Sequence, residues 1–239
     1  MYAIRTEGLK KDFGAVQALK GLSLDLSAGL LHGLIGSDGA GKTTALRVLA
    51  GLLKPSSGEV KYFRDGAAAA FSDVRPGLAY MPQQASLYPD LSVAEHLEFF
   101  RELYRLPPED FKKRSGELLE LTRLAKFRER RAGQLSGGMY KKLGLMCALL
   151  QAPSVLLLDE PTNGVDPISR REFWELLYAL AARQVLVIVS TAYMDEAERC
   201  ARVHLLDAGR LLASGEPRAV LKERGAASFE EIFIKGAAL

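Results

Sequence analysis

The sequence predicts an α/β protein built around a parallel sheet, and two observations support this prediction. Two short runs, Val155–Leu158 and Val185–Val189, are apolar at every position, as strands are when both faces of a sheet are covered. Segments with helical character, Ser169–Ala182 and Met194–Cys200, alternate with these runs. Strands that alternate with helices are typical of a parallel sheet with helices on its faces.

Other elements can be placed along the rest of the chain. The first thirty residues are expected to form strands and turns, because Leu22, Leu24 and Leu26 alternate with other residues. A helix is expected at Lys42–Ala50, directly after a glycine-rich segment. Further strands are expected at Leu30–Ile35, at Leu78–Met81, and as two edge strands within Val203–Gly215, around a turn at Ala208–Gly209.

The middle of the chain, Leu91–Leu150, is predicted to be a mostly helical insertion. Ser92 and Glu95 have the spacing of a capping box, which marks the start of a helix. Apolar residues then recur at helical spacing until Pro107–Pro108 interrupts the pattern, and a second helix is expected over Glu109–Leu124.

Composition narrows the class of protein. The 239 residues are 48% hydrophobic and 26% charged, which is ordinary for a globular chain and excludes general disorder. A net charge of +3 is too small to indicate a nucleic-acid partner by itself. The two cysteines, Cys147 and Cys200, lack metal-ligand spacing, so a reduced cytosolic chain is expected. No signal-peptide core is visible after Met1, and no apolar run reaches the roughly 20 residues that span a bilayer.

A glycine-rich segment between the predicted strand Leu30–Ile35 and the predicted helix has the pattern of a phosphate-binding loop. The pattern G-x-x-x-x-G-K-[ST] is matched by Gly36, Ser37, Asp38, Gly39, Ala40, Gly41, Lys42 and Thr43. Glycines allow backbone N–H groups to turn toward phosphates, and the following helix adds its positive end. Lys42 is expected at the β- and γ-phosphates, Thr43 at Mg²⁺ and Thr44 at the α-phosphate. The alternative is a chance match in a turn.

Two acids end the apolar strand Val155–Leu158. Asp159 stands at the tip of this strand, where it can hold the coordination shell of Mg²⁺, and Glu160 follows, where it can orient and deprotonate water. The alternative is a pair of solvated acids in a turn. Together with the phosphate-binding loop, the pair predicts a Mg²⁺-dependent phosphohydrolase.

A second glycine motif lies between the loop and the acids, in the run Leu135–Met139. Ser136, Gly137 and Gly138 can form another anion site at a helix start. Two such sites have a use in a head-to-tail dimer, where each subunit completes the site of the other. With these motifs in this order, the chain resembles the nucleotide-binding domains of ATP-binding cassette (ABC) proteins over nearly its whole length.

This resemblance implies a fold and further site residues. The implied fold is a P-loop (RecA-like) core with an N-terminal antiparallel β subdomain and an inserted α-helical subdomain. Residues 1–88 and 151–239 would form the core with the β subdomain, and residues 89–150 the helical signature subdomain. Phe13 matches the aromatic residue that stacks on adenine, although a core position is the alternative. Gln83, or its neighbour Gln84, matches the glutamine that contacts Mg²⁺ or water, and Asp166 the acid that contacts the dimer partner.

The chain departs from the family at one chemically important position. The family usually has a histidine after the strand that matches Val185–Val189, and here that position holds Ala192. A methyl group can neither donate a hydrogen bond to phosphate nor help to place water. None of the three histidines, His32, His96 and His204, is a substitute at the level of sequence. A weakly hydrolysing site in an asymmetric pair, or in the first cassette of a tandem protein, is therefore expected.

The resemblance implies a peripheral subunit at the cytoplasmic face of the cell membrane. Its cofactors would be ATP and Mg²⁺, and its partners a transmembrane permease and a second ABC domain. The form of Leu135–Met139 and the tail Ser228–Phe233 favour export of drugs or lipids. Two alternatives stay open. One is a soluble ABC ATPase that acts on ribosomes or nucleic acid, although the basic stretch Arg123–Arg131 is better explained as a solvated helix face. The other is a non-hydrolysing regulatory half, which Ala192 keeps open.

Overall fold

The computed structural model describes residues 1–84 and 87–236. The strands are β1 (Tyr2–Phe13), β2 (Val16–Ser27), β3 (Leu31–Ile35), β4 (Ser57–Arg64), β5 (Ala67–Ala69), β6 (Leu78–Met81), β7 (Val155–Asp159), β8 (Leu186–Thr191), β9 (Arg202–Asp207) and β10 (Arg210–Gly215). The α-helices are α1 (Lys42–Leu49), α2 (Phe71–Val74), α3 (Val93–Tyr104), α4 (Pro108–Leu121), α5 (Gly137–Leu149), α6 (Pro167–Ala182), α7 (Pro217–Arg224) and α8 (Phe229–Gly236). Short 3₁₀ helices are η1 (Arg75–Gly77), η2 (Ala125–Phe127), η3 (Ala132–Gln134) and η4 (Met194–Arg199).

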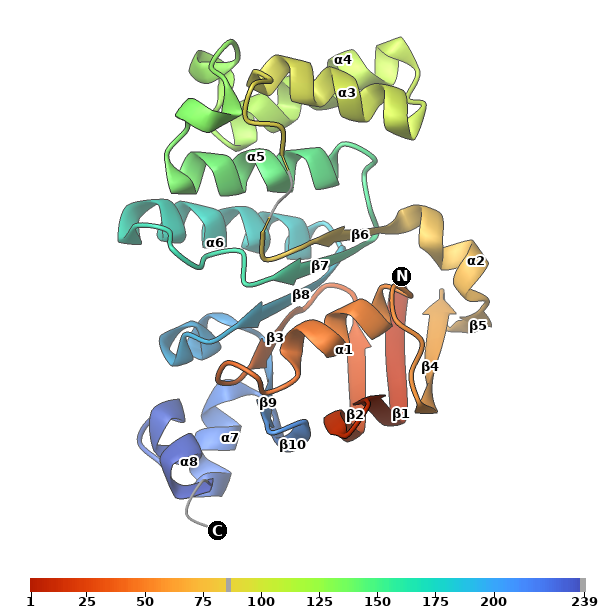
Figure 1. Cartoon of the computed structure of the whole chain (residues 1–239), viewed down its shortest axis with the longest axis vertical. Coiled ribbons are helices and arrows are strands. Elements are labelled where there is room, and N and C mark those ends of the chain that lie inside the picture. The colour runs from red at the N-terminus through yellow and green to blue at the C-terminus, as the bar shows by residue number, and fades with distance from the viewer. Residues whose placement is uncertain (85–86, 237–239) are drawn as a thin grey trace.

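The strands form two sheets. One has the order β10-β9-β3-β8-β7-β6, and its strands are parallel except for β10, which pairs with β9 in the antiparallel direction. The other is antiparallel, with the order β2-β1-β4-β5. The fold is therefore the expected one, a P-loop core of parallel strands with an N-terminal antiparallel sheet and inserted helices (Figure 1).

Both faces of the parallel sheet are covered, as the uniformly apolar strands predict. On β7, Leu156 and Leu158 belong to the core on the side of α5 and α6. The alternating residues Val155 and Leu157 belong to a second core that α1 and the antiparallel sheet complete. All four side chains are buried. Because successive side chains of a strand point to opposite faces, a strand with two apolar environments must be apolar throughout.

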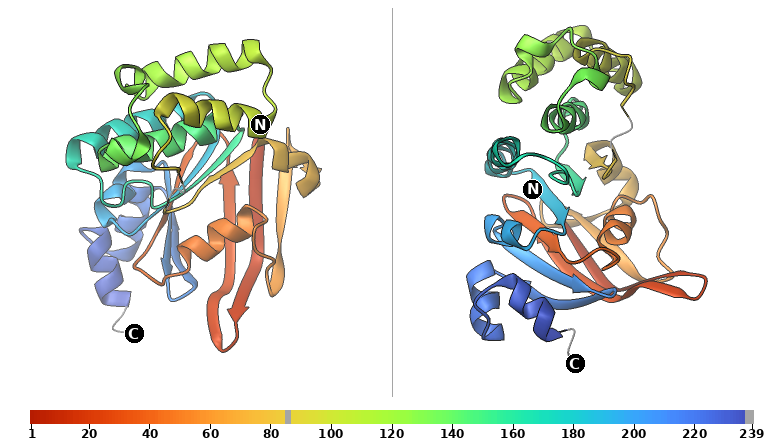
Figure 2. Two further views of the ribbon diagram at one scale, coloured as in Figure 1. Left: turned by 45° about the horizontal axis from the view of Figure 1, so that its top comes forward. Right: turned by 60° about the vertical axis from the view of Figure 1, so that its left-hand side comes forward.

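Helices α3, α4 and α5 gather at one end of the molecule, and α7 and α8 lie at the other end (Figures 1 and 2). The predicted capping box starts α3: Ser92 Oγ accepts from the N–H of Glu95 at 3.2 Å, and Glu95 Oε2 accepts from the N–H of Ser92 at 2.7 Å. Within residues 1–84 and 87–236, no helix is both long enough and apolar enough to cross a bilayer.

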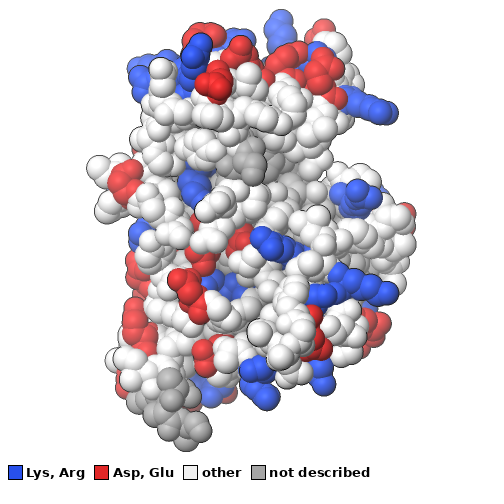
Figure 3. Space-filling view, viewed as in Figure 1, with Lys and Arg blue, Asp and Glu red and all other residues white. Residues whose placement is uncertain are grey.

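The expected boundary of one helix was wrong, for a local reason. The helix expected over Glu109–Leu124 runs from Pro108 and ends at Leu121, because Arg123 takes a left-handed backbone conformation with φ 60° that a helix does not continue. In the basic stretch Arg123–Arg131 the helical part is the three-residue 3₁₀ helix η2, so these basic residues do not share one face of a helix. Arg123 instead pairs with Glu172 at 2.6 Å. On the surface over α3 and α4, basic and acidic side chains are interspersed (Figure 3).

Two further expectations near the C-terminus were corrected. The segment expected as a helix at Met194–Cys200 is the 3₁₀ helix η4, which has only six residues between β8 and β9. Short connections of this kind suit the tighter 3₁₀ geometry. Of the two expected edge strands, only β10 lies at the edge, since β9 pairs with β3 on its other side.

Two buried histidines link the parallel strands β3 and β9. His32 Nδ1 and His204 Nε2 lie 3.1 Å apart, and their rings are stacked. The outer nitrogens are also occupied: His32 Nε2 contacts the backbone of Ser27, and His204 Nδ1 bonds to the Ser214 hydroxyl at 2.8 Å. Burial lowers the pKa of His32 to about 4 and that of His204 to about 3, so both rings are neutral in the folded protein at neutral pH.

This pair should make the fold sensitive to acid. In the unfolded chain both imidazoles titrate near pH 6.5. Below that pH the unfolded state binds two protons, while both imidazoles of the folded state stay unprotonated until their lower pKa values are reached. The free energy of unfolding should therefore fall by on the order of 5 kcal/mol between pH 7 and pH 4.5, about 2.5 kcal/mol for each histidine. Urea denaturation across this range measures the slope. In a His32→Asn, His204→Asn variant the slope should be smaller, and an unchanged slope would contradict the assignment.

Candidate nucleotide-binding site

The segment Gly36–Thr43 connects the end of β3 to the start of α1, as the motif requires. Gly39 and Gly41 have φ angles of 79° and 100°, in the region where residues with a Cβ are strained. A Cβ on Gly41 would also lie 2.6 Å from the carbonyl oxygen of Ala18. The glycines are therefore needed for the turn of this loop.

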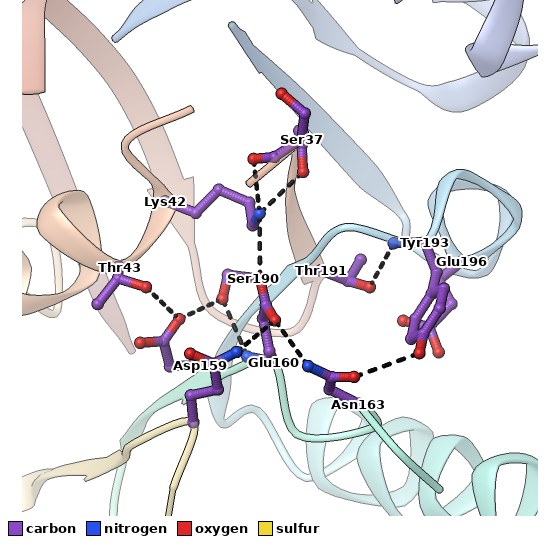
Figure 4. Close-up of polar contacts among 12 residues, drawn as sticks. Ser37, Lys42, Thr43, Asp159, Glu160, Asn163, Ser190, Thr191, Tyr193 and Glu196 are labelled. Atoms are coloured by element: carbon purple, nitrogen blue, oxygen red, sulfur yellow. Dashed lines mark hydrogen bonds and ion pairs between the residues drawn. The ribbon is translucent and has the colours of Figure 1, made fainter. Parts of the chain in front are cut away.

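The side chain of Lys42 is buried and points into the loop. Its Nζ donates to the carbonyl oxygens of Gly36 at 2.8 Å and Ser37 at 3.0 Å. The same Nζ forms an ion pair with Glu160 Oε1 at 3.1 Å (Figure 4). The ammonium thus lies between the phosphate-binding loop and the second acid, and its contact with the β- and γ-phosphates stays a prediction.

Asp159 lies at the end of β7 and is fully buried, and three hydroxyl groups donate hydrogen bonds to its carboxylate. Oδ1 accepts from Thr43 Oγ1 at 3.0 Å and from Ser190 Oγ at 2.7 Å, and Oδ2 accepts from the Tyr80 hydroxyl at 3.1 Å. Burial is the main cause that raises the pKa of Tyr80, so this phenol stays a neutral donor. The Asp159 carboxylate and the Thr43 hydroxyl are the hard oxygen donors that Mg²⁺ prefers, so the residues fit this ion.

Glu160 leaves the strand in a strained conformation that aims its side chain at Lys42. Its φ of 45° is in the left-handed region, and its N–H bonds to both the carbonyl and the hydroxyl of Ser190, at 3.1 and 3.0 Å. Strain at a non-glycine residue of this kind is typical of functional sites. Glu160 Oε2 accepts from Gln83 Nε2 at 2.8 Å, which places Gln83, the first of the two candidate glutamines, against the acid pair.

A cavity of about 540 Å³ is lined by Lys42, Thr43, Gln83 and Glu160, while the buried Asp159 lies outside its lining. This volume is in the range of small-molecule and cofactor sites. Of the predicted site residues, those that line it are Asp38, Gly39, Ala40, Gly41, Lys42, Thr43, Thr44, Gln83 and Glu160. The sequence interpretation missed the remaining lining residues, Val16, Gln17, Ala18, Lys20 and Ala208, which come from the start of β2 and the β9–β10 turn.

Phe13 ends β1, opposite Val16 in the hairpin. Its side chain is 49% exposed, and Lys11 Nζ lies 5.1 Å from the centre of its ring. The core position considered as an alternative is therefore wrong. Stacking on adenine stays a prediction, supported by the nearness of Val16 to the cavity.

The second glycine motif and Asp166 form a separate cluster at two adjacent helix starts. Ser136 caps α5 and accepts from the N–H of Met139 at 3.3 Å, while Asp166 caps α6 and accepts from the N–H of Ser169 at 2.9 Å. The backbone bond to Ser169 lowers the pKa of Asp166. A Cβ on Gly138 would clash with Ser169, so the glycine allows the two helices to approach. This cluster does not line the cavity that holds Lys42.

Ala192 follows the last residue of β8, Thr191, at the position where the resemblance places a histidine. All three histidines of the chain have partners elsewhere. His32 and His204 form the buried pair described above, and His96 accepts from the N–H of Tyr88 at 3.0 Å within the helical part. None of them lines the cavity with Lys42.

These features define a P-loop nucleoside triphosphatase. They are the phosphate-binding loop between β3 and α1, the acid pair at the end of β7, and a parallel sheet that is covered on both faces. Comparison with known proteins gives the family. Residues 19–163 match the family model described as "ABC transporter". The chain belongs to the ABC transporter family, and it is an ATP-binding domain of the class that hydrolyses ATP in this family.

Individual relatives agree with this family. The chain is 46% identical over 234 residues to the Probable multidrug ABC transporter ATP-binding protein YbhF of Escherichia coli K12. The alignment covers 95% of this chain and 39% of that protein. It therefore spans about two fifths of that relative's length. It is 38% identical to the Nod factor export ATP-binding protein I of Rhizobium sp. strain N33, with 97% of this chain and 76% of that protein covered.

A solved ATP-binding subunit of an ABC transporter has the same fold, with a TM-score of 0.82 and 28% identity over 97% of this chain and 98% of the other. The ATP-binding cassette MJ1267 in its ADP conformation superposes with a TM-score of 0.83, over 98% of this chain and 99% of the other, at 24% identity. At that identity the second likeness concerns the fold alone.

Proposed function

We propose that this chain binds and hydrolyses Mg-ATP at a dimer interface, and that it does so as the ATP-binding part of an ABC exporter. One observation carries the proposal: Lys42, Thr43 and Glu160 line one cavity, and Asp159 is buried directly behind Thr43, with Lys42 Nζ 3.1 Å from Glu160 and Thr43 Oγ1 3.0 Å from Asp159. Phosphoryl transfer needs a cation, a metal-holding acid and a water-orienting acid at one point.

Each residue has a role in this proposal. The loop Gly36–Thr43 and Thr44 bind the phosphates, with Lys42 at the β- and γ-phosphates. Thr43, Asp159 and Gln83 would hold Mg²⁺, which supplies neutralisation of the charge that develops on the phosphates. Glu160 orients water and takes its proton. Phe13 stacks on adenine.

The second cluster is proposed to act on the partner's nucleotide. Ser136, Gly137 and Gly138 form the start of α5 and Asp166 that of α6, and both starts are separate from the chain's own cavity. The N–H groups at a helix start favour an anion. In a head-to-tail dimer with a second ABC domain, this cluster would close the site of the partner, so that each site needs both domains.

Export through a transmembrane permease is proposed from the names of relatives. Their printed names include multidrug transport, Nod factor export and daunorubicin resistance. The proposed location is the cytoplasmic face of the membrane. Residues 89–150 would be the helical signature subdomain, and residues 1–88 with 151–239 the nucleotide-binding core. Lys141 Nζ donates to the Gln83 carbonyl at 2.6 Å, which ties helix α5 to the segment that contacts Glu160.

Because Ala192 has no proton donor, we expect weak turnover in the chain's own site. Ala192→His should raise the steady-state rate of ATP hydrolysis by about 10- to 100-fold, since a positioned proton-transfer or hydrogen-bonding group contributes on the order of 10²–10⁴. The measurement is phosphate release by the full chain with saturating Mg-ATP. Ala192→Asn, which adds polarity without an imidazole, is the control. Equal rates for parent and Ala192→His would show that the missing imidazole does not limit turnover.

A further inference from the structure

We infer that Asn163 and Tyr193 are positioning residues for Glu160, and that together they hold its carboxylate in the orientation that activates water. This inference rests on the proposed hydrolysis of ATP. Asn163 comes from the turn after β7, and Tyr193 directly follows Ala192; the sequence interpretation gave neither residue a role. Figure 4 shows the two side chains joined to each other and to Glu160.

The bonds of Asn163 determine how its amide is turned. Its Nδ2 lies 3.3 Å from Glu160 Oε2, and its Oδ1 lies 3.3 Å from the hydroxyl of Tyr193. An ionised carboxylate can only accept hydrogen bonds, so the amide nitrogen must face Glu160. The amide oxygen is then left to accept from Tyr193. Reversing the amide would place its oxygen against the Glu160 carboxylate and lose that bond, so the bond to Glu160 sets the direction in which Asn163 and Tyr193 meet.

Tyr193 is itself held from two sides. Its N–H donates to Thr191 Oγ1 at 3.0 Å, which fixes the backbone beside the end of β8. The guanidinium of Arg170 on α6 lies 4.3 Å from the centre of its ring, within the range of a cation–π contact. These two contacts fix the position of the ring independently of the hydrogen bond between its hydroxyl and Asn163.

Arg170 is placed by a buried acid. Its Nε lies 3.8 Å from Glu196 Oε1, and Glu196 is fully buried. The Glu196 carboxylate accepts from Trp174 Nε1 and from Thr162 Oγ1, each at 3.0 Å. Arg170 Nε has no hydrogen-bond partner among the described residues, so Glu196 holds it by charge attraction, which the interior of a protein weakens less than water does. A continuous series of contacts thus runs from the core at α6 to the carboxylate of Glu160.

The series matters because Asn163 is exposed and sits in a turn. A free asparagine side chain would sample several rotamers, and ordering it costs conformational entropy. The Tyr193 hydroxyl removes part of that freedom. Gln83 and Asn163 both donate to Oε2 of Glu160, at 2.8 and 3.3 Å, so the carboxylate is fixed through one oxygen and the other is left toward the cavity and Lys42.

The test uses two single variants and their combination in the full chain. Tyr193→Phe removes only the hydroxyl and keeps the ring under Arg170, and it should slow single-turnover cleavage of Mg-ATP by about 3- to 10-fold, the loss expected for one hydrogen bond. Asn163→Ala should slow it by about 10-fold. The dissociation constant for Mg-ATP should change by less than about twofold in both, since neither side chain binds phosphate in this account.

The double variant separates positioning from a general structural role. If both residues act through one bond, Tyr193→Phe adds nothing once Asn163 is alanine, so the double variant should match Asn163→Ala alone. Tyr2→Phe is the matched control, because its ring also lies against an arginine, Arg64, but on β1. It should leave the cleavage rate unchanged.

Three results would overturn the inference. They are an unchanged rate in Tyr193→Phe, additive losses in the double variant, and a loss that appears in the affinity for Mg-ATP in place of the rate. A parent chain that binds Mg-ATP and never cleaves it would instead overturn the proposed hydrolysis, and the inference with it, so the two failures are distinguishable.

Discussion

Replacing Glu160 by glutamine should abolish ATP hydrolysis while Mg-ATP binding persists. The amide keeps the size of the side chain and still meets Gln83 and Asn163, but it cannot take a proton from water. The expected loss of rate is about 10²- to 10⁴-fold, the contribution of a positioned general base. Phosphate release measures the rate, and calorimetric titration with Mg-ATP measures binding, which should stay within about threefold of the parent because Glu160 makes no proposed phosphate contact.

The contrast with an acid elsewhere makes this result specific. Glu223 is exposed on α7, at the opposite end of the molecule from the helices α3 and α4, and Glu223→Gln should behave as the parent does. If Glu160→Gln hydrolysed ATP at the parent rate, Glu160 would not be the base, and the strained φ of 45° at this residue would need another explanation.

Replacing Lys42 by alanine should remove binding itself. Lys42 Nζ is the buried cation of the cavity, and hydrogen bonds to charged groups contribute about 1.5–3 kcal/mol each. Two such bonds to phosphates correspond to a loss in Mg-ATP affinity of at least about 10²-fold. The same calorimetric titration checks this, with heat expected from the parent and none at matched concentration from the variant.

A neighbouring effect must be separated from this loss. Without Lys42, the Glu160 carboxylate loses its cation at 3.1 Å, so the thermal unfolding of the variant should be recorded beside the titration. Lys113→Ala, at an exposed position on α4, is the control for removal of one positive charge. Identical titrations of parent and Lys42→Ala, both without heat, would leave the proposed nucleotide site without support.

Much of the fold could be predicted from local pattern. The continuous apolar runs at β7 and β8 follow directly from burial on both faces, and the start of α3 follows from the capping bonds of Ser92 and Glu95. Boundaries set by backbone conformation were harder. The left-handed residue Arg123 ends the α4 region although nothing in its side chain requires that conformation. The sequence likewise did not distinguish the 3₁₀ helix η4 from a short α-helix, because that difference is also one of backbone conformation.

The site was predicted to the extent that its residues share motifs. Lys42, Thr43, Asp159 and Glu160 were found because their order and flanking strands restrict them to one place. Ser190 was missed, although it directly follows the apolar run Val185–Val189. It pairs with Asp159 in the parallel register of β7 and β8, and its hydroxyl bonds to that carboxylate at 2.7 Å. A polar residue at the end of a buried strand was the available signal.

The sequence by itself predicted the chemistry, from a phosphate-binding loop, a pair of acids at a strand end, a second glycine motif and an alanine at the position where the resemblance places a histidine. These are properties of nearest neighbours along the chain, and neighbours along the chain fix local backbone geometry. Only the tertiary structure decided that Asn163 and Tyr193, from turns after different strands, meet at Glu160. Their contact depends on the parallel pairing of β7 with β8 and on the packing of α6, and such long-range contacts leave no spacing in the sequence from which they can be read.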